Sequence, residues 1–149
     1  MHFVDRLPYE AYLQLLKVSA THVYLTYPFV LSWSLIEAMA AGCAIVAADT
    51  PGSRTVMRDG VQGAMVPIEG PDCTALLADA CERLLRDANA RRRAGEAGRR
   101  TAAQYDWSKV TRRVLDVYGE LLTGRAAGVQ GIEDVRRGED VVVAAGSAA

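Results

Sequence analysis

The chain has 149 residues, half of them hydrophobic and 23% charged, which is typical of a globular protein with a buried core. Its formal net charge of −1 argues against a basic surface for nucleic acid, so we expect no nucleic-acid partner. The longest apolar stretch, 38–48, is far shorter than the ~20 residues of a membrane helix, and no signal peptide opens the chain. We therefore expect no membrane span and a cytoplasmic location.

Short β-like runs alternate with helical patterns from the start of the chain. Residues 2–4 can form a strand, and a helix is predicted after Pro8, where proline is tolerated. Three residues of this helix recur at helical spacing: Tyr12, Leu15 and Leu16. The β-branched and aromatic run 22–26 then predicts a strand that ends before Pro28.

A second helix is predicted to follow this strand. Ser32 can cap it, and Gly42 can end it after Ala41. A buried strand is predicted next, at 44–47, followed by a turn at 51–52 that leads into a short helix. A second turn is predicted at 59–60 and a further strand at 63–66.

From Pro71 onward the pattern is helical. Asn89 can cap an arginine-rich helix that reaches about Gln104, and Ser108 can cap a last amphipathic helix. A helix before the arginine-rich one has an apolar stripe of Leu76, Leu77, Ala80, Leu84 and Leu85. The last helix has an apolar stripe of Val110, Val114, Leu115, Tyr118, Leu121 and Leu122. Residues 124–149 are rich in glycine and alanine and are predicted to be a disordered tail.

Strand–helix alternation followed by terminal helices predicts an α/β domain with a parallel sheet over residues 1–123. Cys43, Cys73 and Cys81 are odd in number and lack C-x-x-C spacing, which argues against a disulfide framework and a zinc site. We interpret all three as buried or inert thiols and expect neither a metal nor a cofactor.

The loop after the second predicted strand carries the most specific pattern. A helix beginning near Ser32 offers backbone N–H groups and a dipole that favour a phosphate, at the strand end where α/β sheets bind ligands. Glu37 lies about one and a half turns into that helix. A carboxylate there can accept hydrogen bonds from the vicinal hydroxyls of a ribose.

Several segments together resemble a known family: the run Leu35–Gly42, the apolar strand after it, residues 49–52 and 59–60, and Gly63. The pattern is similar to the C-terminal, nucleotide-sugar-binding domain of retaining GT-B glycosyltransferases (glycosyltransferase family 4, a bacterial subgroup). The resemblance runs from about His2 to Leu122 and implies a partial Rossmann-like parallel sheet of GT-B type, truncated at the N-terminus, with C-terminal helices.

The resemblance also implies roles for individual residues. The family signature is Glu, seven residues, Glu; its second glutamate matches Glu37, implied to bind the donor ribose, and its first matches Phe29, which can accept no hydrogen bond. Loop amides near the donor phosphate and sugar match Ser32 and Trp33, and a further family glutamate falls at Thr55. No catalytic residue is assigned.

The basic residues and the acceptor domain that the family places upstream of residues 2–4 have no counterpart in this sequence. We therefore expect a fragment that binds a nucleoside-diphosphate sugar, is inactive alone, exposes apolar sheet edges and can self-associate. Two alternatives stay open: a non-catalytic interaction module, or the second half of a split glycosyltransferase with a separately encoded acceptor domain. A weaker third is RNA or membrane binding by Arg91–Arg100, five arginines that more often form a solvated face.

Overall fold

The computed structural model describes residues 4–26 and 30–122. The chain divides into two compact units, 1–106 and 107–149, of which the first contains the sheet. The predicted strand at 2–4 falls mainly on residues outside the described part, and Val4 belongs to no strand. The predicted tail, 124–149, also lies outside it.

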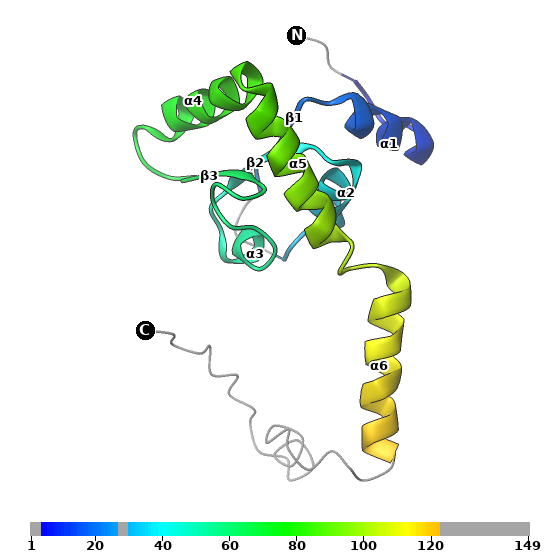
Figure 1. Cartoon of the computed structure of the whole chain (residues 1–149). Helices are drawn as coiled ribbons and strands as arrows, with labels where there is room; N and C mark the ends of the chain where they lie inside the picture. The colour runs from blue at the N-terminus through cyan, green and yellow to red at the C-terminus, as the bar shows by residue number, and fades with distance from the viewer. Residues whose placement is uncertain (1–3, 27–29, 123–149) are drawn as a thin grey trace. The chain divides into compact units, whose positions relative to one another are not determined.

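The sheet has three parallel strands in the order β1 (Thr21–Tyr24), β2 (Ala44–Ala48) and β3 (Gly63–Val66) (Figure 1). Val46 of β2 lies opposite Val23 of β1 and Ala64 of β3. Every residue of β2 is buried, as expected for the central strand of a parallel sheet covered on both faces. The order and direction of the strands confirm the predicted α/β class.

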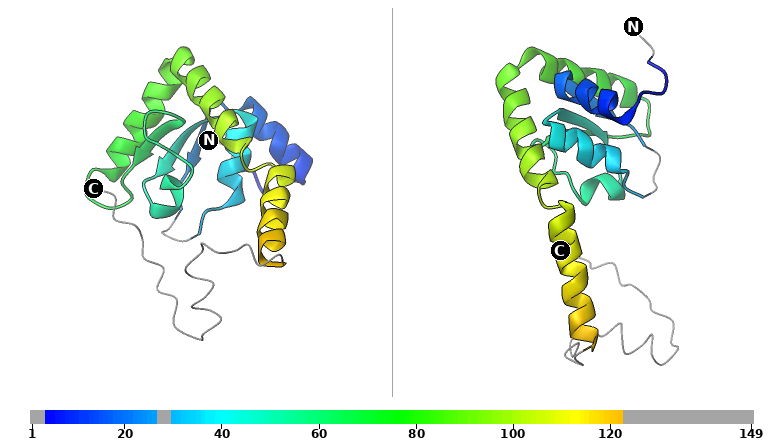
Figure 2. Two further views of the ribbon diagram at one scale, coloured as in Figure 1. Left: turned by 60° about the horizontal axis from the view of Figure 1, so that its bottom comes forward. Right: turned by 90° about the vertical axis from the view of Figure 1, so that its right-hand side faces the viewer.

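Helices cover both faces of the sheet (Figure 2). Ile45 and Ala47 belong to a core cluster with side chains of α1 and α2, whereas Ala44 and Val46 pack with side chains of α4. Fully burying a side chain such as Ile45 contributes about 1.5–3 kcal/mol to the stability of the fold. Burial of the side chains of β2 therefore stabilises this unit. The helices of the first unit are α1 (Tyr9–Val18), α2 (Trp33–Ala41), α3 (Pro51–Arg54), α4 (Cys73–Arg86) and α5 (Ala88–Ala102).

Helix α5 joins the two sides of the sheet (Figures 1 and 2). It contributes Ala94 to the cluster on the α4 face and Ala102 to the cluster on the α2 face. Its buried residues are all small, which lets its backbone approach α2 closely. Gly42 ends α2 in the left-handed conformation at φ 87°, which confirms the predicted stop.

Helix α6 (Trp107–Leu122) belongs to the second unit and has no buried residue. Its predicted apolar stripe is solvent-accessible, with Leu122 88% exposed. Within residues 4–26 and 30–122, no helix is long and apolar enough to cross a membrane.

Two predicted helix caps are wrong. Asp87, not Asn89, caps α5: its Oδ1 accepts a hydrogen bond of 2.8 Å from the Ala90 amide, and the helix begins at Ala88. Ser108 is the second residue of α6 rather than its cap, because α6 begins at Trp107. In both places an aspartate directly precedes the helix, and aspartate is as good an N-cap as asparagine or serine.

Two further expectations needed correction. Pro51 and Gly52 do not form a turn ahead of α3 but are its first residues, with Thr50 as the cap. The apolar stripe of α4 is narrower than predicted, because Leu76 and Leu85 are exposed while Ala80 and Leu84 are buried. Only the side that packs on Ala44, Val46 and Val66 is covered by the sheet in the described part of the chain.

The cysteines are all free. Cys43 is buried, as predicted, and its thiol donates to the Leu16 carbonyl over 3.1 Å. Cys73 and Cys81 are half-buried on α4.

Candidate functional site

The candidate site begins where α2 begins, after the carboxyl end of β1. Ser32 has extended backbone angles and its Oγ accepts a hydrogen bond of 3.3 Å from the Ser34 amide, so the predicted N-cap is confirmed. Trp33, the first residue of the helix, is 59% exposed. The positive end of the α2 dipole lies at these two residues.

The Ser32 amide is already engaged. It donates a 3.1 Å hydrogen bond to the hydroxyl of Tyr24, the buried last residue of β1. This bond ties the start of α2 to the end of the strand. For the Ser32 amide to bind a phosphate, the Tyr24 hydroxyl would have to give it up, so the roles of Ser32 and Trp33 stay predictions.

Glu37 lies in the second turn of α2 and is half-buried. Its Oε1 accepts a hydrogen bond of 2.9 Å from the Tyr9 hydroxyl, which comes from the start of α1. The second tyrosine of α1, Tyr12, has a buried hydroxyl close to the same carboxylate, without a well-formed hydrogen bond within the described part of the chain. The structure thus places two tyrosines beside the carboxylate predicted to bind a ribose.

Both tyrosines respond to that carboxylate. The hydrogen bond to Glu37 raises the pKa of Tyr9, and burial followed by the negative charge of Glu37 raises the pKa of Tyr12. Sequence reasoning placed Tyr12 in an apolar stripe and gave Tyr9 no role. The available signal was two tyrosines at a spacing of three, which share a helix face.

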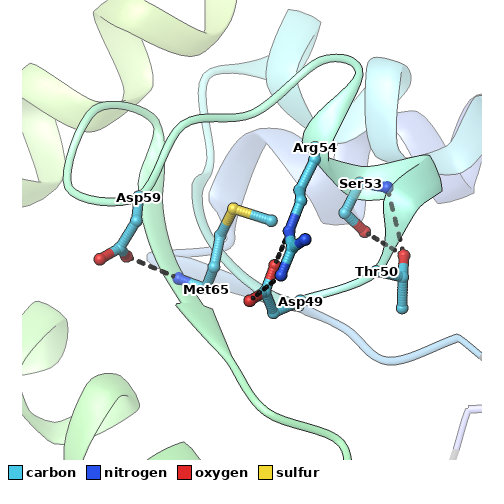
Figure 3. Close-up of polar contacts among 6 residues, drawn as sticks. All are labelled: Asp49, Thr50, Ser53, Arg54, Asp59 and Met65. Atoms are coloured by element: carbon cyan, nitrogen blue, oxygen red, sulfur yellow. Dashed lines mark hydrogen bonds and ion pairs between the residues drawn. The ribbon is translucent and has the colours of Figure 1, made fainter. Parts of the chain in front are cut away.

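The loop between β2 and α3 forms the next part of this edge of the sheet (Figure 3). The Arg54 guanidinium donates two hydrogen bonds to the Asp49 carboxylate, Nε to Oδ1 at 2.6 Å and Nη2 to Oδ2 at 2.8 Å. This pairing holds the pKa of Asp49 below its ordinary value. The Arg54 guanidinium is therefore already paired with the carboxylate of the loop that precedes α3.

Thr55, directly after α3, stands where the resemblance implies a further glutamate, and its hydroxyl donates to the Gly52 carbonyl over 2.7 Å. The Thr50 hydroxyl accepts from the Ser53 amide at the start of α3 (Figure 3). In this structure the polar groups of the loop satisfy one another. Phe29, which matches the first glutamate of the family signature, lies outside the described residues.

One hollow, of about 380 Å³, includes Arg54 and Thr55 at the end of α3, and two others lie nearer to β1 and α1. One of these two, of about 340 Å³, opens at the carboxyl ends of β1 and β3 and includes Glu69 and Cys73 but none of the predicted site residues. The other, of about 500 Å³, is lined by Arg6, Leu7, Pro8, Tyr9 and Tyr12. The hollow at α1 is the most relevant, because it shares both tyrosines with the surroundings of Glu37.

The arginines of α5 do not form one free basic face. Arg91 donates to the carbonyls of Leu84 and Leu85 at the end of α4, over 2.7 and 2.5 Å. Arg99 donates to the Ala41 carbonyl at the end of α2, over 2.9 Å. These two cations stabilise helix carboxyl ends, which weakens the RNA- or membrane-binding alternative. Across residues 4–26 and 30–122, no cluster of three or more His, Cys, Asp or Glu side chains could hold a metal ion.

Residues 1–101 match the family model described as "Glycosyl transferases group 1". The chain belongs to this family. The match covers the sheet, the Glu37 helix and the β2–α3 loop, so the resemblance found in the sequence is confirmed.

Several curated members of the family are similar to this chain. The phosphatidyl-myo-inositol mannosyltransferase of Mycobacterium tuberculosis is 43% identical over 97 residues, which are 64% of this chain and 25% of the mannosyltransferase. The alpha-maltose-1-phosphate synthase of the same organism is 37% identical over 87 residues, 56% of this chain and 22% of the synthase. The chain thus spans about a quarter of the length of these relatives.

Among solved structures, the sucrose-phosphate synthase from Thermosynechococcus elongatus is similar in fold. The TM-score is 0.68 at 27% sequence identity, and the similarity covers 83% of this chain and 30% of the synthase. Together with the family match, this confirms the predicted Rossmann-like α/β architecture of GT-B type.

Proposed function

We propose that this glycosyltransferase-family chain binds the donor of a retaining hexose transfer, a nucleoside-diphosphate sugar. In this proposal Glu37 accepts hydrogen bonds from the vicinal hydroxyls of the ribose. The start of α2, at Ser32 and Trp33, faces the diphosphate or the sugar. The names of the relatives, a mannosyltransferase and an alpha-maltose-1-phosphate synthase, support the hexose class.

The observation that carries the proposal is the setting of Glu37. Glu37 is a half-buried residue on the helix that follows β1, within the segment that the family model matches. Its neighbours on α1 hold the carboxylate in place, as binding a diol requires. One of its oxygens already accepts a hydroxyl hydrogen bond, from Tyr9.

Isothermal titration of the purified chain with UDP, GDP and ADP tests this proposal. We expect at least one of them to bind, and Glu37→Gln to weaken that binding about tenfold or more, because a charged acceptor of two hydroxyls is lost. Glu96→Gln is the matched control, since Glu96 is an exposed residue of α5. No binding by the wild type, or equal binding by Glu37→Gln, would refute the proposal.

We also propose that the chain alone does not transfer sugar. Departure of a nucleoside diphosphate needs electrostatic stabilisation. The arginine at the β2–α3 edge, Arg54, is paired with Asp49, and the helix N-terminus alone is a weak substitute for a cationic clamp. Glycosyl transfer or donor hydrolysis by the purified 149-residue protein would contradict this statement.

A second candidate function is an interaction module or one half of a split glycosyltransferase. It is favoured by β1, which pairs only with β2 in the described structure and exposes Val23 at 43%. An unpaired strand edge is a template for pairing with another chain. Co-purification with a separately encoded acceptor-domain protein would support this function over simple donor binding.

A further inference from the structure

We propose that Tyr9 and Tyr12 position the Glu37 carboxylate, and that they thereby determine whether the site distinguishes a ribose from a 2′-deoxyribose. This inference rests on the proposed function, because it concerns the same carboxylate. Both tyrosines are positioning residues that act through Glu37. They come from a helix whose only assigned role so far is to cover the sheet.

The first observation is the Tyr9 hydroxyl. Tyr9 is 59% exposed, yet its Oη reaches across from α1 to Oε1 of Glu37 at 2.9 Å. Tyr9 and Tyr12 also contact each other, with ring centroids 6.3 Å apart and planes inclined by 33°. The exposed ring is therefore fixed at two points, by its neighbour and by the carboxylate.

The second observation is the buried hydroxyl of Tyr12. It makes no well-formed hydrogen bond within the described residues, and Tyr12 packs against the core cluster that includes α2. Burial, then the charge of Glu37 and hydrogen bonding to its carboxylate, raise the pKa of Tyr12, so the hydroxyl and the carboxylate lie close together. A buried hydroxyl without a well-formed hydrogen bond is costly, and the carboxylate beside it is the acceptor that relieves that cost.

Two hydroxyls suit the chemistry of the carboxylate. Its two oxygens together offer about four acceptor sites, so hydroxyls from α1 can hold it and still leave sites for a ligand. A glutamate side chain that is free to rotate pays entropy when it orders around a ligand, and one that is held in place does not. The gain is largest for a ligand that uses both oxygens, as a 2′,3′-diol does, and smaller for a 2′-deoxy ligand.

Isothermal titration of the full chain with each nucleoside diphosphate and its 2′-deoxy form tests this inference. The variants are Tyr9→Phe and Tyr12→Phe, with Tyr118→Phe on α6 as the matched control. We expect each α1 variant to weaken ribonucleotide binding about threefold to tenfold and 2′-deoxynucleotide binding clearly less, so that discrimination falls. Tyr118→Phe should change neither.

The outcomes separate the two proposals. If the wild type binds no nucleoside diphosphate, the proposed function fails, and the specificity role of the tyrosines fails with it. If the wild type binds and discriminates but the α1 variants weaken both sugars equally, the tyrosines are merely structural. In that case the positioning role is refuted, while donor binding stands.

A second measurement does not depend on any ligand. In a chain with ¹³Cζ-labelled tyrosine, NMR titration should show Tyr9 ionising above the ordinary tyrosine pKa of about 10. Glu37→Gln should lower that pKa. Glu10, whose charge also contributes to the raised pKa of Tyr9, is present in both proteins. An unaltered titration of Tyr9 in a folded Glu37→Gln protein would overturn the inference.

Discussion

Gly95 of α5 packs directly against the carbonyl oxygen of Gly42: a Cβ at position 95 would stand 2.2 Å from that oxygen. Beside this contact, the Arg99 side chain of α5 donates to the Ala41 carbonyl, the residue before Gly42. The carboxyl end of α2, the helix that carries Glu37, is therefore fixed by α5 through one backbone contact and one hydrogen bond. The position of the candidate site depends on this packing.

We predict that Gly95→Ala lowers the free energy of unfolding by about 1–3 kcal/mol, because the added methyl must push two backbones apart. This loss exceeds the gain of about 1 kcal/mol that alanine usually brings to a helix interior. Urea unfolding followed by circular dichroism measures it. Gly98→Ala is a control on the same helix, because a Cβ there would meet Met39 Cα at an ordinary contact distance of 3.4 Å. Gly119→Ala is a second control, because a Cβ there would have no atom within 4 Å. Equal stability of all three variants would contradict the prediction.

A second prediction concerns the start of α5. Asp87→Ala should destabilise the protein, because the Ala90 amide loses its acceptor, while Asn89→Ala should not. The backbone hydrogen bond from Ala90 also lowers the pKa of Asp87, so its contribution is present above about pH 4 and lost as the pH falls through the lowered value. Thermal unfolding at pH 7 and pH 2.5 tests both points. If Asn89→Ala lowered the stability more than Asp87→Ala, Asn89 would be the cap, as the sequence predicted.

The sequence allowed most of the fold to be predicted, because local signals and tertiary structure agree there. The buried strand at 44–47, the Ser32 cap and the Gly42 stop each depend on the chemistry of a few adjacent residues, and all three are confirmed. The two wrong caps occurred where two suitable caps lie within two residues, as Asp87 and Asn89 do. Propensity cannot rank such neighbours, and packing decides between them.

The surroundings of the site could not be predicted in the same way. Tyr9 is 28 residues from Glu37 in sequence, and only the packing of α1 on α2 brings them together. The pairing of Arg54 with Asp49 spans five residues across a loop and a helix start, where no simple spacing rule applies. Such contacts follow from the fold rather than from a local pattern.

Cysteine reactivity gives a third prediction. The Cys43 thiol is buried, donates to the Leu16 carbonyl, and has a pKa raised by burial. The thiolate is the reactive form, so Cys43 should resist iodoacetamide in the native protein far longer than the half-buried Cys73. Mass spectrometry of peptides after timed labelling measures each rate. Labelling of Cys43 as fast as Cys73 would show that the α1–α2 core opens readily.

The last prediction is a pH dependence that arises from β1. Burial lowers the pKa of His22 below its ordinary value of about 6.5. In the range between the two values the unfolded chain binds more protons than the folded one, so the free energy of unfolding should fall as the pH drops below about 6.5. Above that pH the imidazole is neutral in both states and should contribute no slope. The effect follows from burial alone, since no charged partner accounts for the shift.

Urea unfolding at pH 7.5, 6.5 and 5.5 measures this slope in the wild type and in His22→Gln, whose side chain does not titrate. The difference in unfolding free energy between the two proteins should shift against the wild type as the pH falls, while shared carboxylates cancel. Parallel curves for the wild type and His22→Gln would mean that His22 is protonated as easily in the folded protein as in the unfolded one.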